Sequence, residues 1–184
     1  MGGFLMKKLL SALAAAVLVP FSAFAISLSD ITDNPDQYTK TYENENIAYY
    51  VDNNSIESVR YSPPYYTIQG DLYAVVYPVS IIIKNSLSVG YDYNRSAFKL
   101  IPEMKASNPS ITNREIRMKL IEESTKDIGI TMYCYNRSNW RFDGSLDKIV
   151  APEEFPVLLG NKITYRTANY FFYKIYNQYF SLKA

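Results

Sequence analysis

The sequence reads YYTIQGDLYAVVY at residues 65–77, and this stretch decides the fold. Side chains alternate across a β-strand, so apolar residues at every second position indicate a core face. That face consists of the even positions: Tyr66, Ile68, Gly70, Leu72, Ala74 and Val76. The opposite face, turned to solvent or a partner, consists of Tyr65, Thr67, Gln69, Asp71, Tyr73, Val75 and Tyr77. Gly70, near the middle of so long a strand, predicts a bulge or bend.

Shorter strands are expected on both sides of this one. The candidate ranges are 47–51, 56–61, 79–84, 89–93 and 128–135. Turns are predicted at Asn85-Ser86 and Asp143-Gly144, because these residue types favour turns. The range 99–113 contains two prolines and much polar sequence, which predicts a long surface loop.

Residues 114–123 give two conflicting signals. Thr112 and Glu115 have the spacing of a capping box, which opens a helix. Apolar and charged residues alternate from Glu115 to Leu120, which is the period of a strand. We expect a strand that forms a hairpin with 128–135.

The last element is predicted to be a helix. Its apolar residues recur at helical spacing: Ala168, Phe171, Phe172, Ile175, Tyr176 and Tyr179. Such a stripe packs against one face of a sheet. The predicted fold class is therefore α+β, a single mostly antiparallel β-sheet of about five to seven strands packed against a C-terminal α-helix. Residues 26–184 are expected to form one such domain.

Residues 1–25 have the pattern of a cleavable signal peptide. Lys7 and Lys8 precede an apolar run, Leu9–Val19, and the small-x-small ending Ala23-Phe24-Ala25 follows. The apolar run is too short to cross a bilayer, which needs about 20 residues. We expect export to the periplasm or the medium, with no stable membrane insertion after removal of the leader.

Composition argues against several classes of function. Charge is nearly balanced, with 19 Lys+Arg against 18 Asp+Glu, so no basic field favours nucleic acid. The chain has no histidine, which removes the usual general base and the commonest transition-metal ligand. Cys134 is the single cysteine and is expected to be a small buried hydrophobe. We expect no cofactor and no metal. The acidic lead-in Asp30, Asp33 and Asp36 fits turns and caps, with a calcium loop as the alternative.

Tyrosine is unusually abundant, with 18 residues. Its ring packs on a pleated face while its hydroxyl stays in water, so a β-rich protein accounts for this abundance. Exposed tyrosines also form binding surfaces. The outward residues Tyr65, Tyr73 and Tyr77 are therefore the predicted ligand-binding residues, and no catalytic residue is predicted.

The favoured function is an exported, non-enzymatic binding module for a protein or glycan. One alternative is a periplasmic inhibitor or assembly partner of another protein, which predicts a contiguous exposed apolar patch. The other is a carboxylate-based enzyme acting on envelope material. It predicts two convergent acids, at least one of them with a raised pKa. Nothing in the sequence indicates an oligomeric state.

One short segment occurs twice. Tyr91–Ser96 and Tyr133–Ser138 agree at five of six positions, as YDYNRS and YCYNRS. Two strands that end in the same kind of turn would explain the repeat. A duplicated unit, or a paired site that presents Arg95 and Arg137, is the alternative.

Four segments in this order carry a wider resemblance: YYVDNNSI at 49–56, PPYY at 63–66, YDY at 91–93 and ANYFF at 168–172. Their order resembles small exported bacterial proteins of unassigned function. More distantly, 47–142 is similar to the surface-adhesin protein E family. That resemblance implies an antiparallel sheet backed by a helix, and binding of host extracellular proteins. This chain lacks a cysteine pair and a lipid-attachment cysteine, and no binding residue of that family has a matching position here.

Overall fold

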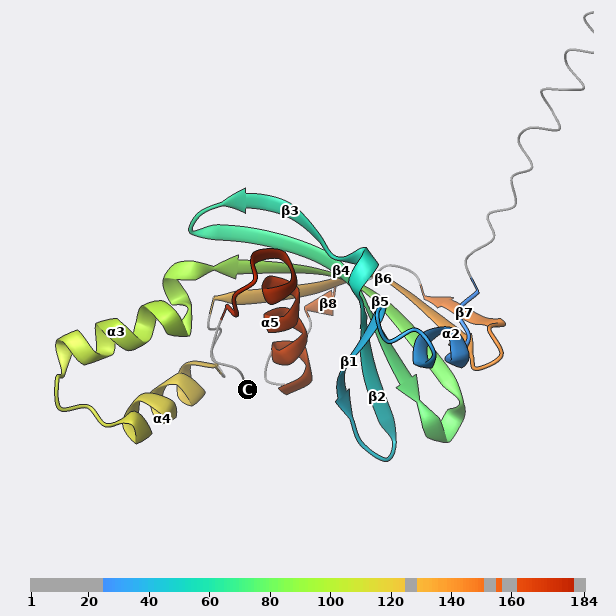
Figure 1. Ribbon diagram of the computed structural model, residues 1–184, viewed down its shortest axis with the longest axis horizontal. Helices are drawn as coiled ribbons and strands as arrows, with labels where there is room; N and C mark the ends of the chain where they lie inside the picture. Colours follow the sequence, from blue (N-terminus) through green and yellow to red (C-terminus); the bar gives the residue numbers. More distant parts are fainter. Residues whose placement is uncertain (1–24, 125–128, 151–154, 157–161, 181–184) are drawn as a thin grey trace, which may run out of the picture.

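A computed structural model describes residues 25–124, 129–150, 155–156 and 162–180, so the predicted leader 1–25 lies almost wholly outside the described residues. Eight strands form one antiparallel sheet (Figure 1). They are β1 (Tyr38–Glu43), β2 (Ile47–Asp52), β3 (Glu57–Ser62), β4 (Tyr65–Val76), β5 (Ile81–Asp92), β6 (Ile130–Arg141), β7 (Leu146–Val150) and β8 (Phe155–Pro156). The helices are α2 (Leu28–Thr32), α3 (Ala97–Ser107), α4 (Asn113–Ser124) and α5 (Lys162–Tyr176). The predicted α+β class, with one antiparallel sheet and a C-terminal helix, is confirmed.

The sheet is a meander in the order β1-β2-β4-β5-β6-β7, and β4 lies near its centre. The half of β4 toward Val76 pairs with β2, and the half toward Tyr65 pairs with β3. A short 3-10 turn, η1 (Asn53–Ser55), separates β2 from β3, where the Asp52 carboxylate accepts the backbone N–H of Asn54 at 3.0 Å. Each of the 12 residues of β4 pairs with β5 without a break in register. The bulge predicted at Gly70 is therefore wrong.

Helix α5 covers one face of the sheet and forms the larger core. The predicted stripe is confirmed in its centre, because Ala168, Phe171 and Phe172 are fully buried. They pack against the even positions Ile68 and Leu72 of β4 and against neighbouring residues of β5 and β6. Tyr91 adds a polar tie, since its hydroxyl donates a hydrogen bond of 2.8 Å to the Ala168 carbonyl.

Close packing of α5 on β4 requires a residue without a side chain at position 70. A Cβ atom at Gly70 would lie 2.7 Å from Cζ of the buried Phe171 ring, closer than packed atoms approach. We expect Gly70→Ala to lower the free energy of unfolding by about 1–3 kcal/mol through overpacking. Urea unfolding would measure this. In a Phe171→Leu background the same substitution is expected to cost less, and an equal cost in both backgrounds would contradict the contact.

A second core lies at the other end of the sheet, on the odd-numbered face of β4. The N-terminal residues Ile26, Ile31 and Tyr38 pack there on Tyr73 and Val75 of β4. The rings of Tyr38 and Tyr73 meet edge to face, with centroids 5.5 Å apart. Tyr73 is only 4% exposed, so its predicted outward, open position is wrong. Alternation along β4 correctly predicts that Tyr73 lies on the odd face. A segment distant in sequence covers that face around Tyr73.

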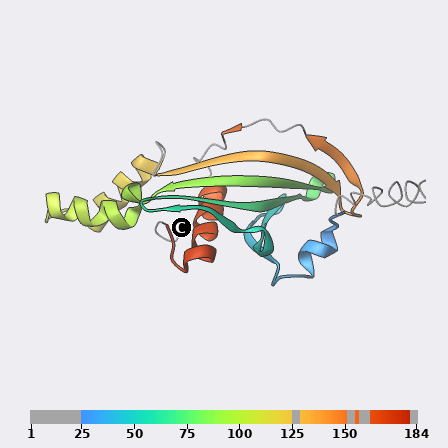
Figure 2. The same cartoon turned by 90° about the horizontal axis from the view of Figure 1, so that it is seen from above.

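Both covers appear on the same side of the sheet when the molecule is seen from above (Figure 2). Long strands twist to the right, so one face of the sheet turns along its length. Helix α5 packs on the even face at one end of β4, and α2 lies over the odd face at the other end. At the α5 end, no described helix covers the odd face of β4. At the α2 end, no described helix covers its even face.

Between β5 and β6, the segments predicted to be a loop and a strand are the helices α3 and α4. Both helices extend beyond the end of the sheet (Figure 1). The loop predicted at 99–113 is wrong over most of its length, because Ser96 caps α3 by accepting the backbone N–H of Lys99. The strand predicted at 114–123 is also wrong. The Glu115 carboxylate accepts the backbone N–H of Thr112, and the Thr112 hydroxyl accepts the backbone N–H of Glu115. This capping box starts a helix, so the local helix signal prevails.

The predicted turn at Asn85-Ser86 is wrong too, because both residues lie inside β5. The hairpin turn falls earlier, at η2 (Tyr77–Val79) and Ser80, whose φ of 53° closes it. The turn at Asp143-Gly144 is confirmed between β6 and β7, where Gly144 has a φ of 88°.

The repeated hexapeptides adopt different structures. Tyr91–Ser96 ends β5 and passes through the 3-10 turn η3 (Tyr93–Arg95), whereas Tyr133–Ser138 lies wholly within β6. The prediction that both end a strand in the same turn is wrong. The reason is that Asn136 and Arg137 pair with residues of β5 across the sheet.

Among the helices that the structure describes, none combines the length and hydropathy needed to cross a bilayer.

Candidate functional site

The face of the sheet opposite α5 is a polar surface that spans three strands. We call it the open polar face. Its members are Tyr65, Thr67 and Gln69 on β4, Ser88 and Gly90 on β5, and Thr131, Tyr133 and Tyr135 on β6. Cross-strand pairs fix their order, since Ser88 lies between Gln69 and Tyr133. The buried residues Ile130, Met132 and Cys134 of β6 alternate with these and face α5, so the polar side chains point away from that core.

Three tyrosine rings dominate the open polar face. Tyr65, Tyr133 and Tyr135 are 47%, 46% and 41% exposed. From the strand spacing, Tyr65 and Tyr133 lie about 10 Å apart across the sheet and about 13 Å apart along it. Arg60 of β3 lies 5.9 Å from the centre of the Tyr65 ring and extends the surface with a cation. The rings are thus spread over the surface and do not pack into one cluster.

Between Asp92 and Ser86, the middle strand carries only small side chains on this face. Ser88 and Gly90 of β5 lie between longer residues of β4 and β6. A Cβ atom at Gly90 would lie 2.6 Å from the Thr131 hydroxyl, so glycine leaves room for that side chain. The result is a low polar strip along β5, bordered by tyrosine, threonine and glutamine.

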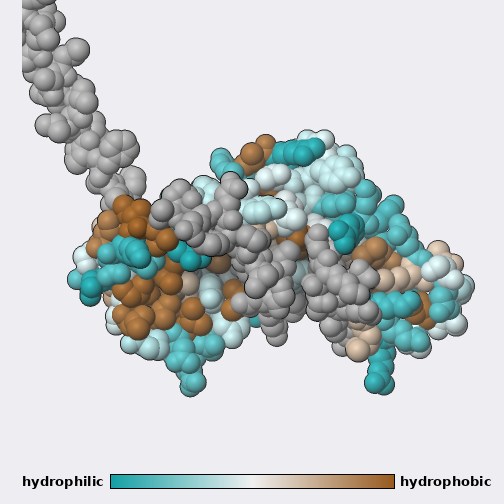
Figure 3. Space-filling model, turned by 180° about the vertical axis from the view of Figure 1, so that it is seen from behind, coloured by the Kyte–Doolittle hydropathy of each residue, from teal (hydrophilic) through white to brown (hydrophobic). Residues whose placement is uncertain are grey.

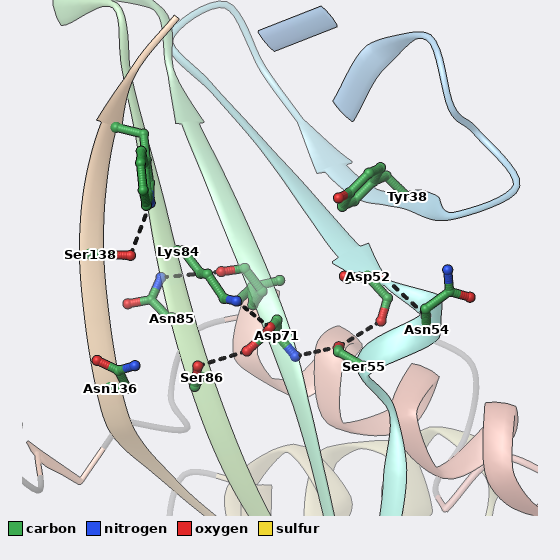
Figure 4. A network of polar contacts seen from close by, with 12 residues as sticks. Tyr38, Asp52, Asn54, Ser55, Asp71, Lys84, Asn85, Ser86, Asn136 and Ser138 are labelled. Carbon is green, nitrogen blue, oxygen red and sulfur yellow. Dashed lines mark hydrogen bonds and ion pairs between the residues drawn. The ribbon is translucent and has the colours of Figure 1, made fainter. Parts of the chain in front are cut away.

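Asp71 anchors the inner end of this surface (Figure 4). Its carboxylate accepts a hydrogen bond of 2.7 Å from the Ser86 hydroxyl and pairs with the Lys84 ammonium, also at 2.7 Å. Its backbone N–H donates to the Ser55 hydroxyl at 2.7 Å. Lys84 in turn lies 5.8 Å from the centre of the Tyr73 ring. The network joins the open polar face to the second core and fixes the register of β4 on β5.

Tyr135 lies close to this anchor and stays protonated. Burial raises the pKa of Tyr135 above its usual range, and the negative charges of Asp71 and Glu57 add to the shift. A protonated phenol is both a donor and an acceptor of hydrogen bonds at neutral pH. The open polar face therefore offers hydroxyl groups that both donate and accept.

The three residues predicted from sequence do not form one surface. Tyr65 lies on the open polar face, whereas Tyr73 is buried under the N-terminal segment. Tyr77 follows the far end of β4, about 40 Å from Tyr65 by strand length. Its hydroxyl donates to the Glu43 carboxylate at 3.0 Å. Burial first, and then this hydrogen bond, raise the pKa of Tyr77 to about 12.

Sequence reasoning missed the two exposed tyrosines of β6. Tyr133 and Tyr135 flank Cys134, which is buried as predicted. The signal was present, because Ile130, Met132 and Cys134 alternate with them in strand period. That alternation indicates that the two rings lie on the face of β6 away from the core, but it does not give the register of β6 on β5.

The carboxylate-based alternative predicts an acid with a raised pKa, and the shifts resolved for the described carboxylates go the other way. Four of them have shifted pKa values, and all four shifts are downward: Asp30, Glu43, Glu115 and Asp143. In each case the largest cause is a hydrogen bond from a neighbouring side chain or backbone group.

Asp30 belongs to the segment for which a calcium loop is the alternative prediction, and it forms the capping box of α2 with Ser27. Within the described ranges, no group of three or more His, Cys, Asp or Glu residues could hold a metal ion.

An apolar patch lies on the even face, at the end where α2 covers the other side. Ile47, Val76 and Ile81 lie side by side on β2, β4 and β5, and Ile83 pairs next to them with Ala74. All but Ala74 are half-exposed. Seen from behind, apolar side chains gather at this end of the molecule, at the left of Figure 3. This is the surface that the assembly-partner alternative would use.

The chain was compared with protein-family models, with curated proteins and with solved structures, and none of the three comparisons gave a significant match. The resemblance to small exported proteins and to the protein E family therefore stays a prediction.

Proposed function

We propose that this protein is a non-enzymatic binding module that holds an extended glycan on the open polar face. The compartment that we propose is the periplasm or the medium, in keeping with the sequence pattern of residues 1–25. The observation that carries the proposal is the spread of three exposed tyrosine rings around a strip of small polar residues on one face of the sheet.

The chemistry of this face suits a sugar chain. A tyrosine ring offers an apolar face, on which the C–H face of a pyranose can lie, together with a hydroxyl that hydrogen-bonds. Thr67, Gln69 and Ser88 add side-chain donors and acceptors between the rings. The spacing of Tyr65 and Tyr133 matches a short oligosaccharide lying diagonally across β5. The polar side chains between the rings favour a hydroxyl-rich ligand over an apolar protein surface.

Tyr133→Ala is expected to weaken glycan binding about tenfold, because removing an exposed aromatic contact costs more than about 1 kcal/mol. A glycan array with envelope and host-matrix oligosaccharides would identify a ligand, and calorimetric titration would then measure its affinity for each variant. Tyr65→Ala and Tyr135→Ala are expected to act in the same direction.

The matched control is Tyr61→Ala. Tyr61 is 69% exposed, but it contacts Tyr66 and Tyr176 on the α5 side of the sheet. It should leave the affinity unchanged. Equal losses for Tyr61→Ala and Tyr133→Ala, or no loss for any of the three open-face variants, would refute the proposal.

A further inference from the structure

A cavity separate from the open polar face lies between the edge strand β1 and helix α5. Its volume is about 220 Å³. It is lined by Thr39, Lys40, Thr41, Arg166, Asn169, Tyr170 and Tyr179. Among the described residues that line it, two are cations and none is a carboxylate. Sites for drug-sized ligands measure about 300–1,000 Å³, so this cavity suits a smaller molecule.

The two cations differ in what they already bind. The Lys40 ammonium pairs with the Glu43 carboxylate at 2.8 Å, so its charge is engaged. Arg166 is half-buried, and no hydrogen bond or ion pair joins it to another residue of the described ranges. A partly desolvated guanidinium is stabilised when a carboxylate or phosphate accepts two of its N–H groups. Arg166 is therefore the residue in the cavity that is expected to bind an anion.

The wall beside Arg166 is held in place before any ligand arrives. The Tyr170 hydroxyl lies 2.9 Å from the Thr39 hydroxyl and donates to the Asn53 side-chain carbonyl at 2.7 Å. These contacts tie α5 to β1 and to the turn after β2. Tyr179 forms another part of the wall, and its ring stacks on Tyr173 with centroids 4.7 Å apart. A preformed wall reduces the entropy that binding must offset.

We propose that this cavity binds a small organic carboxylate, with Arg166 holding its carboxylate group and the rings of Tyr170 and Tyr179 contacting its body. The aromatic wall favours an organic anion over a bare inorganic one. The site is independent of the glycan surface, because its residues come from β1, from α5 and from Tyr179 just beyond α5, and none belongs to the open polar face.

Nuclear magnetic resonance titration of the isotope-labelled protein tests this site. The probes are the sodium salts of acetate, benzoate and glucuronate, and sodium phosphate as the inorganic anion. Glucose is the uncharged match for glucuronate, and sodium chloride is the ionic-strength match. We expect saturable shifts at Thr39, Thr41 and Tyr170 with at least one carboxylate, and none with glucose or chloride. Arg166→Gln should weaken that binding at least tenfold, since it removes a charge-assisted pair.

Two further variants keep the result decisive. Arg166→Lys retains the charge but loses the planar fork, so an intermediate affinity is expected. Arg60→Gln removes a cation from the other side of the sheet and should change nothing at this cavity. The proposal is overturned if no carboxylate gives a saturable shift, or if Arg166→Gln leaves the shifts unchanged while Trp140 fluorescence shows a folded protein. Inorganic phosphate binding as tightly as the carboxylates would also overturn the assignment to an organic anion.

Discussion

Replacing Phe172 with alanine is expected to lower the free energy of unfolding by about 3–5 kcal/mol. Phe172 is fully buried at the centre of the α5 core. Its ring contacts four others, with centroid distances of 5.4 Å to Tyr66, 5.0 Å to Tyr91, 4.7 Å to Tyr176 and 5.3 Å to Phe180. The substitution removes these contacts and leaves a cavity that four rings border.

Urea unfolding followed by Trp140 fluorescence measures this effect. Trp140 is the only tryptophan and lies in the second core, so it reports whether losing the first core unfolds the whole sheet. Phe98→Ala is the matched control, because Phe98 of α3 is 46% exposed and its loss should cost less than about 0.5 kcal/mol. Equal costs for the two substitutions would contradict the placement of α5 on the sheet.

Alkaline pH is expected to destabilise the protein steeply above about pH 10. Burial raises the pKa of Tyr91 and of Tyr73 well above the ordinary value, and it raises the pKa of Tyr38 to about 12. The unfolded chain loses these protons near pH 10, whereas the folded chain keeps them. Stability is therefore fully present below pH 10. It is lost as the pH rises toward the folded pKa values, by about 1.4 kcal/mol per pH unit for each such tyrosine.

Urea midpoints between pH 8 and pH 11.5 would show this loss. Tyr73→Phe removes one titrating group from the second core and should flatten the decline above pH 10. Tyr65→Phe removes a tyrosine that is 47% exposed and should leave the slope as it is. A stability that stays constant from pH 10 to 11.5 would mean that Tyr73 and Tyr91 are not buried in solution.

The sequence predicts the fold class because its two strongest patterns are local. Alternation in 65–77 identifies β4, and the helical spacing around Phe171 and Phe172 identifies α5. Both patterns arise from burial of one face, which repeats every two or every 3.6 residues. Cross-strand partners that lie far apart in sequence leave no such pattern, and they explain why Asn85 and Ser86 were mistaken for a turn. Their side chains bond Arg137 and Asp71 inside the sheet.

The candidate site was predicted only in part, because exposure depends on what covers a strand. Tyr65 and Tyr73 share the odd face of β4, and nothing near them in sequence distinguishes their exposure. The difference comes from Ile26, Ile31 and Tyr38, which cover Tyr73 and leave Tyr65 open. Tyr133 and Tyr135 join Tyr65 only because β6 pairs with β5 in one particular register.

The central claim is that ligand binds on the open polar face, and hydrogen exchange with and without a bound oligosaccharide tests it most directly. The account predicts slower exchange in β4 and β6 around Thr67, Gln69 and Tyr133, with no change near Ile81 and Ile83. Protection confined to the apolar patch at Val76, Ile81 and Ile83, with no protection around Tyr133, would contradict the claim.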